Sequence, residues 1–212
     1  MPLLLQYNIG KVEVHVWKIT ETVEELLGVV PAVYAPCISR FKSRDRMVQW
    51  LAVRAIIAQR FGGSVRIAYD AAGKPVLEGA EGCVTLSHTD GYAVLAYSRD
   101  GDIGVDAELQ SRNVLRVADR FMHTGSLDCF QLSDRNLVAL LHWCAKEALY
   151  KIVGDLGGNF KDNISVDGFE LRDEGRVSLH LVGLDDGGVR DYVVHYSILE
   201  ELLVVLCYKQ DV

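Results

Sequence analysis

The chain of 212 residues has no long apolar run, although half of its residues are apolar. A helix that crosses a bilayer needs about 20 consecutive apolar residues, and no segment of the sequence reaches that length. The first residues, Met1 to Tyr7, lack the basic region and the cleavage site of a secretory signal peptide. These absences predict a cytoplasmic protein with no membrane partner and with enough residues to bury a substantial core.

Cysteine is scarce and is not arranged as a metal or redox motif. No two cysteines show the Cys-x-x-Cys spacing, and their number is odd. Isolated cysteines of this kind are typical of small buried hydrophobes in a reducing compartment. The five are Cys37, Cys83, Cys129, Cys144 and Cys207.

Positive charge is in deficit, because 22 Lys and Arg residues face 29 Asp and Glu residues and leave a formal net charge of -7. Nucleic-acid binders carry a basic field, so no nucleic-acid partner is expected. An anionic ligand would have to meet a local basic cluster. One cluster lies between Arg40 and Arg46. The other, Arg112, Arg116 and Arg120, has a spacing of four that predicts a helical row, which would dock an acidic partner or pair with the chain's own acids.

Acidic residues converge between Ile103 and Lys151. Asp106 and Glu108 are two apart after an apolar run, so a strand would point both carboxylates to one face. On a helix over residues 142–153, Trp143, Glu147 and Lys151 would share one stripe, whereas Cys144 is expected to lie off it and receives no role. Three hard oxygen ligands suit Mg²⁺ together with a phosphate. The alternative is an ordinary strand end and an ordinary i,i+4 ion pair.

Periodicity predicts similar elements in the two halves of the chain. The Asp100-Gly101 turn would join the strands on either side of it as a hairpin. Both long helices precede a Gly and share local sequence, because Trp50 to Ala55 resembles Trp143 to Ala148. The predicted helices are 44–61 and 134–153, and the predicted strands are 11–19, 84–86, 92–98, 103–108, 165–171, 177–181, 190–197 and 202–208.

Four short motifs occur together in a fixed order. They are Gly73-Lys74-Pro75, Ser87-His88, Gly104-Val105-Asp106-Ala107-Glu108 and Trp143-Cys144-Ala145-Lys146-Glu147-Ala148-Leu149-Tyr150-Lys151. In this order and spacing, the pattern resembles the 4'-phosphopantetheinyl transferases, of the longer type that activates surfactin synthetase. The matched region, Gly73 to Lys151, covers more than a third of the chain.

The resemblance implies an α/β (α+β) fold built as a pseudo-two-fold pair of similar halves. Each half would be a small, mostly antiparallel sheet packed with a long helix, and the active site would lie between the halves. We place the halves at residues 1–108 and 109–212. Asp106 and Glu108 would then belong to the first half, Glu147 would belong to the second, and the fused chain would be a monomer.

The implied activity is that of a holo-[acyl-carrier-protein] synthase. Such an enzyme moves the 4'-phosphopantetheine arm of coenzyme A to a serine of an acyl or peptidyl carrier protein and releases adenosine 3',5'-bisphosphate. The resemblance implies Mg²⁺, with Mn²⁺ as a substitute. The alternatives are a catalytically weak relative that only binds coenzyme A or a carrier protein, and an unrelated Mg²⁺-dependent phosphohydrolase.

The resemblance also implies roles for the acids and the lysine of the second helix. Asp106, Glu108 and Glu147 match the acids that hold the metal on the pyrophosphate. Glu147 matches the proposed base for the incoming serine, and Lys151 matches the lysine that binds the pyrophosphate.

Coenzyme A would meet residues of the first half of the chain. Lys74, Ser87 and His88 match positions that contact the phosphates and the adenosine end. Arg46, or alternatively Arg44, matches a basic residue near the 3'-phosphate.

Two departures from the family pattern stand out. Thr85 replaces an Asn that many members have two residues before the Ser-His pair, a small change because both side chains hydrogen-bond. Many members also have an acid about five residues after the position of Phe121, and this chain has none before Asp128. A slower or rearranged site is therefore expected.

Overall fold

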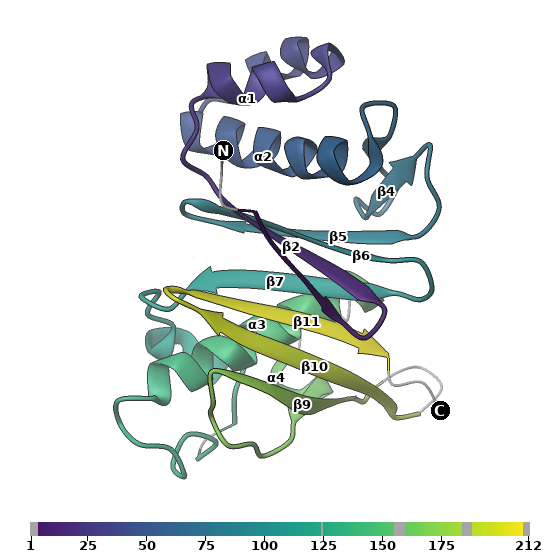
Figure 1. Ribbon diagram of the computed structural model, residues 1–212. Helices are drawn as coiled ribbons and strands as arrows, with labels where there is room; N and C mark the ends of the chain where they lie inside the picture. Colours follow the sequence, from purple (N-terminus) through teal and green to yellow (C-terminus); the bar gives the residue numbers. More distant parts are fainter. Residues whose placement is uncertain (1–3, 124, 155–159, 184–187, 210–212) are drawn as a thin grey trace. The chain divides into compact units, whose positions relative to one another are not determined.

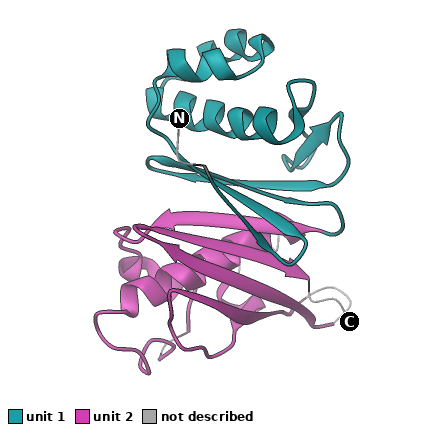
Figure 2. Ribbon diagram, viewed as in Figure 1, with its two compact units in different colours: residues 1–101 teal, residues 102–212 magenta. Residues whose placement is uncertain are grey.

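The computed structural model describes residues 4–123, 125–154, 160–183 and 188–209. The chain divides into two compact units, Met1–Gly101 and Asp102–Val212 (Figure 2). This boundary precedes the one drawn from the sequence, because residues 103–109 pair with a strand near the C-terminus. Asp106 and Glu108 therefore lie in the same unit as Glu147. Among the described residues, no helix combines the length and the apolar character needed to span a membrane.

The first unit is an antiparallel sheet with one long helix packed on it (Figure 1). The sheet order is β1-β2-β6-β5-β4-β3. Three helical segments of different lengths connect β2 to β3. They are α1, η1 and α2. Their bounds and those of the strands are β1 Leu4–Ile9, β2 Val12–Lys18, α1 Val23–Val29, η1 Ala32–Arg40, α2 Arg44–Phe61, β3 Arg66–Tyr69, β4 Pro75–Glu78, β5 Cys83–Thr89 and β6 Tyr92–Ser98.

Helix α2 begins and ends where its sequence signals place it. The Ser43 hydroxyl accepts a hydrogen bond from the backbone N–H of Arg46, and Gly62 ends the helix with φ of 85°. The buried side of α2, including Leu51 and Ile56, packs with Trp17 and other side chains of the sheet. This packing forms the core of the first unit.

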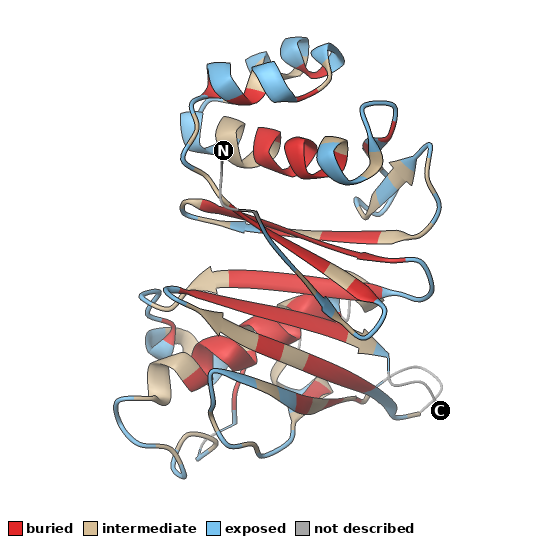
Figure 3. Ribbon diagram, viewed as in Figure 1, coloured by how far each residue is buried: buried red, intermediate tan, exposed pale blue. Residues whose placement is uncertain are grey.

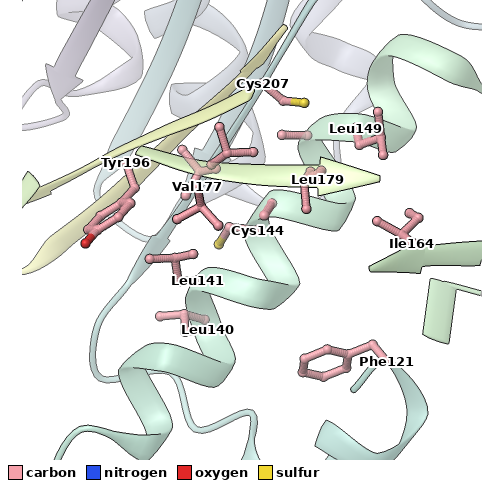
Figure 4. Close-up of a cluster of buried hydrophobic side chains, with 14 of the residues drawn as sticks. Phe121, Leu140, Leu141, Cys144, Leu149, Ile164, Val177, Leu179, Tyr196 and Cys207 are labelled. Carbon is pink, nitrogen blue, oxygen red and sulfur yellow. The ribbon is translucent and has the colours of Figure 1, made fainter. Parts of the chain in front are cut away.

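The second unit repeats this plan with a sheet in the order β7-β11-β10-β9-β8. Its long helix, α3, is buried along most of its length (Figure 3). Figure 4 shows part of the core between α3 and the strands, including Leu141, Leu149 and Val177. The elements are β7 Ile103–Leu109, η2 Leu115–Arg120, α3 Arg135–Val153, α4 Phe160–Asn163, β8 Ile164–Val166, β9 Glu174–Leu181, β10 Arg190–Leu199 and β11 Leu202–Lys209.

The two units share one topology. In each, a strand is followed by a long helix and then by four strands, and the last strand pairs with the first. The order β2-β6-β5-β4-β3 in the first unit corresponds to β7-β11-β10-β9-β8 in the second, and β1 is an addition to the first unit. The predicted fold class, a pair of similar halves with antiparallel sheets and long helices, is confirmed.

Three sequence-based expectations are wrong. Strands β6 and β7 do not form a hairpin around Asp100-Gly101, because β6 pairs with β2 and β5 whereas β7 pairs with β11. The predicted arginine row is not one helical stripe, because only residues 115–120 are helical and they form a 3-10 helix. The strand predicted at 165–171 is also shorter, because β8 ends at Val166.

Candidate active site

The site in the second unit depends on a close approach of β7 and α3. Gly104 lies so near the helix that a Cβ atom at this position would collide with the backbone carbonyl of Ala148. Only glycine allows this distance, since every other residue carries a Cβ. The following residues of the strand are thereby held against the last turns of α3.

Lys151 is the clearest link between the two elements. Its Nζ atom donates to the backbone carbonyl of Val105 at 2.6 Å and to Oδ1 of Asp106 at 2.9 Å. Asp106 is buried, with 7 % of its surface exposed. The lysine thus offsets the charge of a carboxylate that has little access to water.

Glu147 lies one helical turn before Lys151 and shares its face of α3. Burial raises the pKa of its carboxyl group, and the charge of Asp106 raises it further, whereas Lys151 and Arg112 lower it. Among the described residues, no hydrogen-bond donor meets the Glu147 carboxylate. A half-buried carboxylate with a raised pKa is suited to accept a proton.

Glu108 is engaged by a residue that the sequence analysis assigned to a docking row. Arg112 forms an ion pair with it, and the Glu108 side chain is 13 % exposed. The segment that carries Arg112 is fixed by Asn136 at the start of α3, whose amide donates to the Arg112 carbonyl at 3.0 Å and accepts from the Val114 N–H at 3.1 Å. Arg112 therefore belongs to the site.

Cys144 also faces β7. It is fully buried. Burial and then the charge of Asp106 raise the pKa of its thiol, so the thiol stays protonated.

Lys146, next to Glu147 in the sequence, points the other way and has a structural role. Its Nζ atom donates to the carbonyls of Phe121, Phe160 and Ile164 at 2.6, 2.7 and 2.7 Å. Burial lowers the pKa of its ammonium group to about 8. Three segments distant in sequence thus share one buried cation.

The carboxylates fit a magnesium ion that a substrate helps to bind. Among the residues that the structure describes, no three His, Cys, Asp or Glu side chains converge into a complete metal cage. The charge of Asp106 raises the pKa of the Glu147 carboxyl group, as expected for acids of neighbouring elements. Mg²⁺ commonly takes one or two carboxylates plus phosphate oxygens. The predicted ligands Asp106 and Glu147 match this donor set, whereas Glu108 is held in its ion pair with Arg112.

In the first unit, the structure joins two of the predicted coenzyme A contacts. Arg46, in the first turn of α2, has its Nη1 atom 3.2 Å from Nε2 of His88 on β5. Both side chains are exposed. Arg44, the alternative to Arg46, instead bonds Glu24 at 3.2 Å.

The other two predicted contacts lie elsewhere in this unit. Lys74 follows Gly73 in the turn between β3 and β4, where its backbone N–H donates to Oδ1 of Asp70 at 2.8 Å. Ser87 is buried on β5, with 8 % of its surface exposed. The coenzyme A contacts expected of Lys74 and Ser87 therefore stay predictions.

Sequence reasoning missed Arg112 and Lys146 as contributors. No feature of the sequence indicated that Arg112 pairs with Glu108, because the segment that follows β7 and carries Arg112 is irregular. Asp128, the first acid after Phe121, is engaged with Arg135 at 3.6 Å.

The comparison with family models agrees with the second unit. No curated protein matches the chain. The model of the 4'-phosphopantetheinyl transferase superfamily matches residues 102–207, which is half of the chain and begins at the boundary of the second unit. The match spans β7 and α3, and therefore all the acids of the candidate site. The chain belongs to the 4'-phosphopantetheinyl transferase superfamily.

Proposed function

We propose that the protein transfers the 4'-phosphopantetheine arm of coenzyme A to a serine of an acyl or peptidyl carrier protein. The observation that carries this proposal is the pairing of a half-buried Glu147 of raised pKa with Asp106 and Lys151. It combines a proton acceptor, an acid suited to a metal and a cation for phosphate. The family membership supplies the class of reaction.

In the proposed step, the serine hydroxyl oxygen attacks the β-phosphorus of coenzyme A. An O–P bond forms, the bond from phosphorus to the bridging oxygen breaks, and adenosine 3',5'-bisphosphate leaves. The serine proton passes to the Glu147 carboxylate, directly or through a water molecule. Glu147 is a suitable acceptor because burial and Asp106 raise its pKa.

Lys151 and Asp106 would manage the charge of the pyrophosphate. Lys151 Nζ already bonds Asp106 at 2.9 Å, and it can share its remaining proton with a phosphate oxygen. Asp106 and Glu147 would hold Mg²⁺. When bound, the ion neutralises the charge that develops on the leaving phosphate.

The first unit would recognise the nucleotide portion of coenzyme A. Arg46 and His88 form an exposed pair that offers two donors to a phosphate, provided that His88 is protonated or presents its N–H. Lys74 and Ser87 are the further candidates on this unit. We therefore expect Arg46→Ala to raise the KM for coenzyme A more than the KM for dephospho-coenzyme A.

The test of the proposed function is direct. The protein is incubated with coenzyme A, Mg²⁺ and an apo carrier protein, and the carrier is weighed by mass spectrometry. The proposal expects a gain of one phosphopantetheine, and loss of transfer in excess chelator. An unmodified carrier with bound coenzyme A would favour the binding relative.

Glu147→Gln provides the matched test of the site. It should lower kcat by about 10²- to 10⁴-fold, which is the usual contribution of general-base catalysis. The control is Glu170→Gln in the same unit, because Glu170 is exposed and pairs with Arg172. Equal activity of the two variants would remove Glu147 from the mechanism.

A further inference from the structure

His180 on β9 lies between two carboxylates of the second sheet. Its Nδ1 atom is 2.7 Å from Oδ1 of Asp191 on β10, and its Nε2 atom is 3.0 Å from Oδ1 of Asp167, which directly follows β8. The neighbours Leu179 and Leu181 belong to the core, so His180 points to the opposite face of the sheet. One imidazole ring therefore joins β9 to both of the strands beside it.

This geometry requires a proton on each ring nitrogen. The side chains of Asp167 and Asp191 are 56 % and 59 % exposed, and an exposed aspartate is ionised at neutral pH. An ionised carboxylate only accepts hydrogen bonds, whereas a neutral imidazole has a single N–H to donate. Only the positively charged form of His180 can donate to both acids at once.

Strand β8 is the part of the sheet that gains most from this contact. It has three residues, lies at the edge of the sheet and, among the described strands, pairs with β9. Beyond that short ladder, the Asp167 N–H donates to the Ser178 carbonyl at 3.1 Å, and the Asp167 carboxylate accepts from His180. β8 also supplies the Ile164 carbonyl to Lys146, so the strand links this surface cluster with the buried cation.

We propose that His180 is a proton-dependent tie, which holds the end of β8 to β9 and β10 while the imidazole is charged and releases it when the imidazole loses a proton. The neutral ring keeps one of its two bonds. The shorter contact, to Asp191, is the one retained, and Asp167 is released. This conformational device is independent of the proposed function.

The contacts of His180 also give the direction of the pH response. Its bond to Asp191 and then its bond to Asp167, together with the charges of both acids, raise the pKa of the imidazole above the ordinary 6.5, and partial burial opposes this shift. Its partner in the β8 ladder, Ser165, carries no charge. A raised pKa gives stability that is complete below pH 6.5 and is lost as pH rises through the pKa of the folded state. The tie therefore opens on the alkaline side.

The competing explanation is an ordinary surface contact with a neutral ring. His195 provides the matched control, because it lies four residues from Asp191 on β10 and so on the same face of the sheet. Its ring stacks on Tyr208 with the ring centres 5.7 Å apart, and burial, followed by the charge of Arg176, lowers the pKa of its imidazole. The two histidines should therefore titrate on opposite sides of the ordinary value.

The first experiment detects the ring protons. Long-range ¹H–¹⁵N NMR spectra distinguish an imidazolium from each neutral tautomer, and His180→Gln and His195→Gln assign the two signals. The titration midpoint of His180 should lie above 6.5, with both nitrogens protonated below it, whereas the midpoint of His195 should lie below 6.5. Asp191→Asn should lower the His180 midpoint. A His180 midpoint at or below 6.5 would overturn the proposal.

The second experiment measures the opening of β8 by native-state hydrogen exchange. Its probes are the amides at positions 167 and 182, which donate to the carbonyls of Ser178 and Asn163. After correction for intrinsic exchange rates, their protection relative to the amides of β11 should fall about two- to fivefold between about pH 6 and about pH 9, the range of an exposed ion pair.

Two variants separate the tie from a general effect of pH. Asp167→Asn should show the lower protection already at about pH 6 and should lose the pH dependence, because its side chain no longer carries the charge that His180 meets. His195→Gln should respond to pH as the wild type does. A pH dependence that persists in Asp167→Asn, or constant protection in the wild type, would refute the proposal.

Discussion

Helices α2 and α3 occupy the same place in two units of one topology, yet they carry different chemistry. Counted from Trp50 and Trp143, the positions of Cys144, Glu147 and Lys151 on α3 are taken on α2 by Leu51, Arg54 and Ala58. Arg54 is buried and stacks on Trp50, with its guanidinium carbon 3.9 Å from the ring centre. The shared scaffold therefore positions a helix on a sheet, and a few side chains decide whether a reactive group results.

The strands beneath these helices differ in the same sense. On β2, Glu13 bonds Arg60 of α2 at 2.5 and 2.7 Å, and this bond lowers the pKa of the Glu13 carboxyl group. On β7 the corresponding acid is Asp106, and its charge raises the pKa of the Glu147 carboxyl group on α3. In the first unit the acid is satisfied by a cation, whereas in the second unit acids outnumber nearby cations. That excess of negative charge makes the acids of the second unit candidates for a binding site, whereas Glu13 and Arg60 form a structural ion pair.

The largest effect is expected from adding a side chain at Gly104, where β7 and α3 approach each other closely. In Gly104→Ala, the new Cβ would meet the Ala148 backbone carbonyl, which cannot rotate away. We expect a loss of about 3 kcal/mol in the free energy of unfolding. We also expect transfer to fall by about 100-fold, because displaced catalytic groups lose orientation. Urea titration and the mass-spectrometric assay measure the two effects.

Gly28→Ala is the control for this prediction. Gly28 lies in α1 with free space around it, so alanine should raise helix stability by up to about 1 kcal/mol. A Gly104→Ala protein as stable and active as wild type would show that the close approach of β7 and α3 is dispensable.

A second test concerns Lys146, whose counterpart on α2 is the apolar Val53. Lys146→Met removes the donor to three carbonyls and leaves them without that partner. We expect a loss of about 2 to 3 kcal/mol in the free energy of unfolding, measured by urea titration. Lys161→Met, which removes a single exposed bond to the Asp119 carbonyl, should cost less than about 0.5 kcal/mol.

The two units should also respond differently to acid. His142 is buried next to Lys146, and burial lowers the pKa of its imidazole to about 4, against an ordinary 6.5. Between these values the unfolded chain binds the extra proton, so His142 destabilises the fold as pH falls. From pH 7 to pH 5 the loss should be about 2 kcal/mol. Urea titrations should show that His142→Phe removes this part of the acid sensitivity.

His15 in the first unit provides the contrast. Burial lowers the pKa of its imidazole as well, but the adjacent Glu13 carboxylate raises it and opposes that shift. His15→Phe should therefore change the acid sensitivity less than His142→Phe. Equal changes in the two variants would contradict the assigned environments.

The smallest effect is expected at Arg112. Its charge lowers the pKa of Glu147, so Arg112→Gln should raise that pKa and move the acid limb of kcat/KM to higher pH. The shift should be less than about one pH unit, because the Arg112 side chain is half exposed and water screens its charge. Arg116→Gln, on η2, should leave the profile unchanged.

Local sequence was sufficient for the strongest elements. Helix α3 was expected at 134–153 and is found at Arg135–Val153, because its apolar period and Gly154 are local signals. The strand with Asp106 and Glu108 was found for the same reason. Sequence spacing also placed Glu147 and Lys151 on one face.

Long-range pairing was not accessible from sequence. The Asp100-Gly101 turn suggested a hairpin, but β7 pairs with β11, about 100 residues away, and no local signal encodes that choice. The short strands β3 and β4 were missed because four residues give too little alternation. The burial of Phe121 was missed because an irregular segment carries it into the core.

The three bonds of Lys146 have a consequence for how the second unit opens. The carbonyls of Phe121, Phe160 and Ile164 come from separate segments, but releasing any one leaves the buried ammonium group short of a partner. Local fluctuations in these segments are therefore coupled. In native-state hydrogen exchange, the backbone amides near them should exchange as one cooperative group, and in Lys146→Met they should exchange at separate rates.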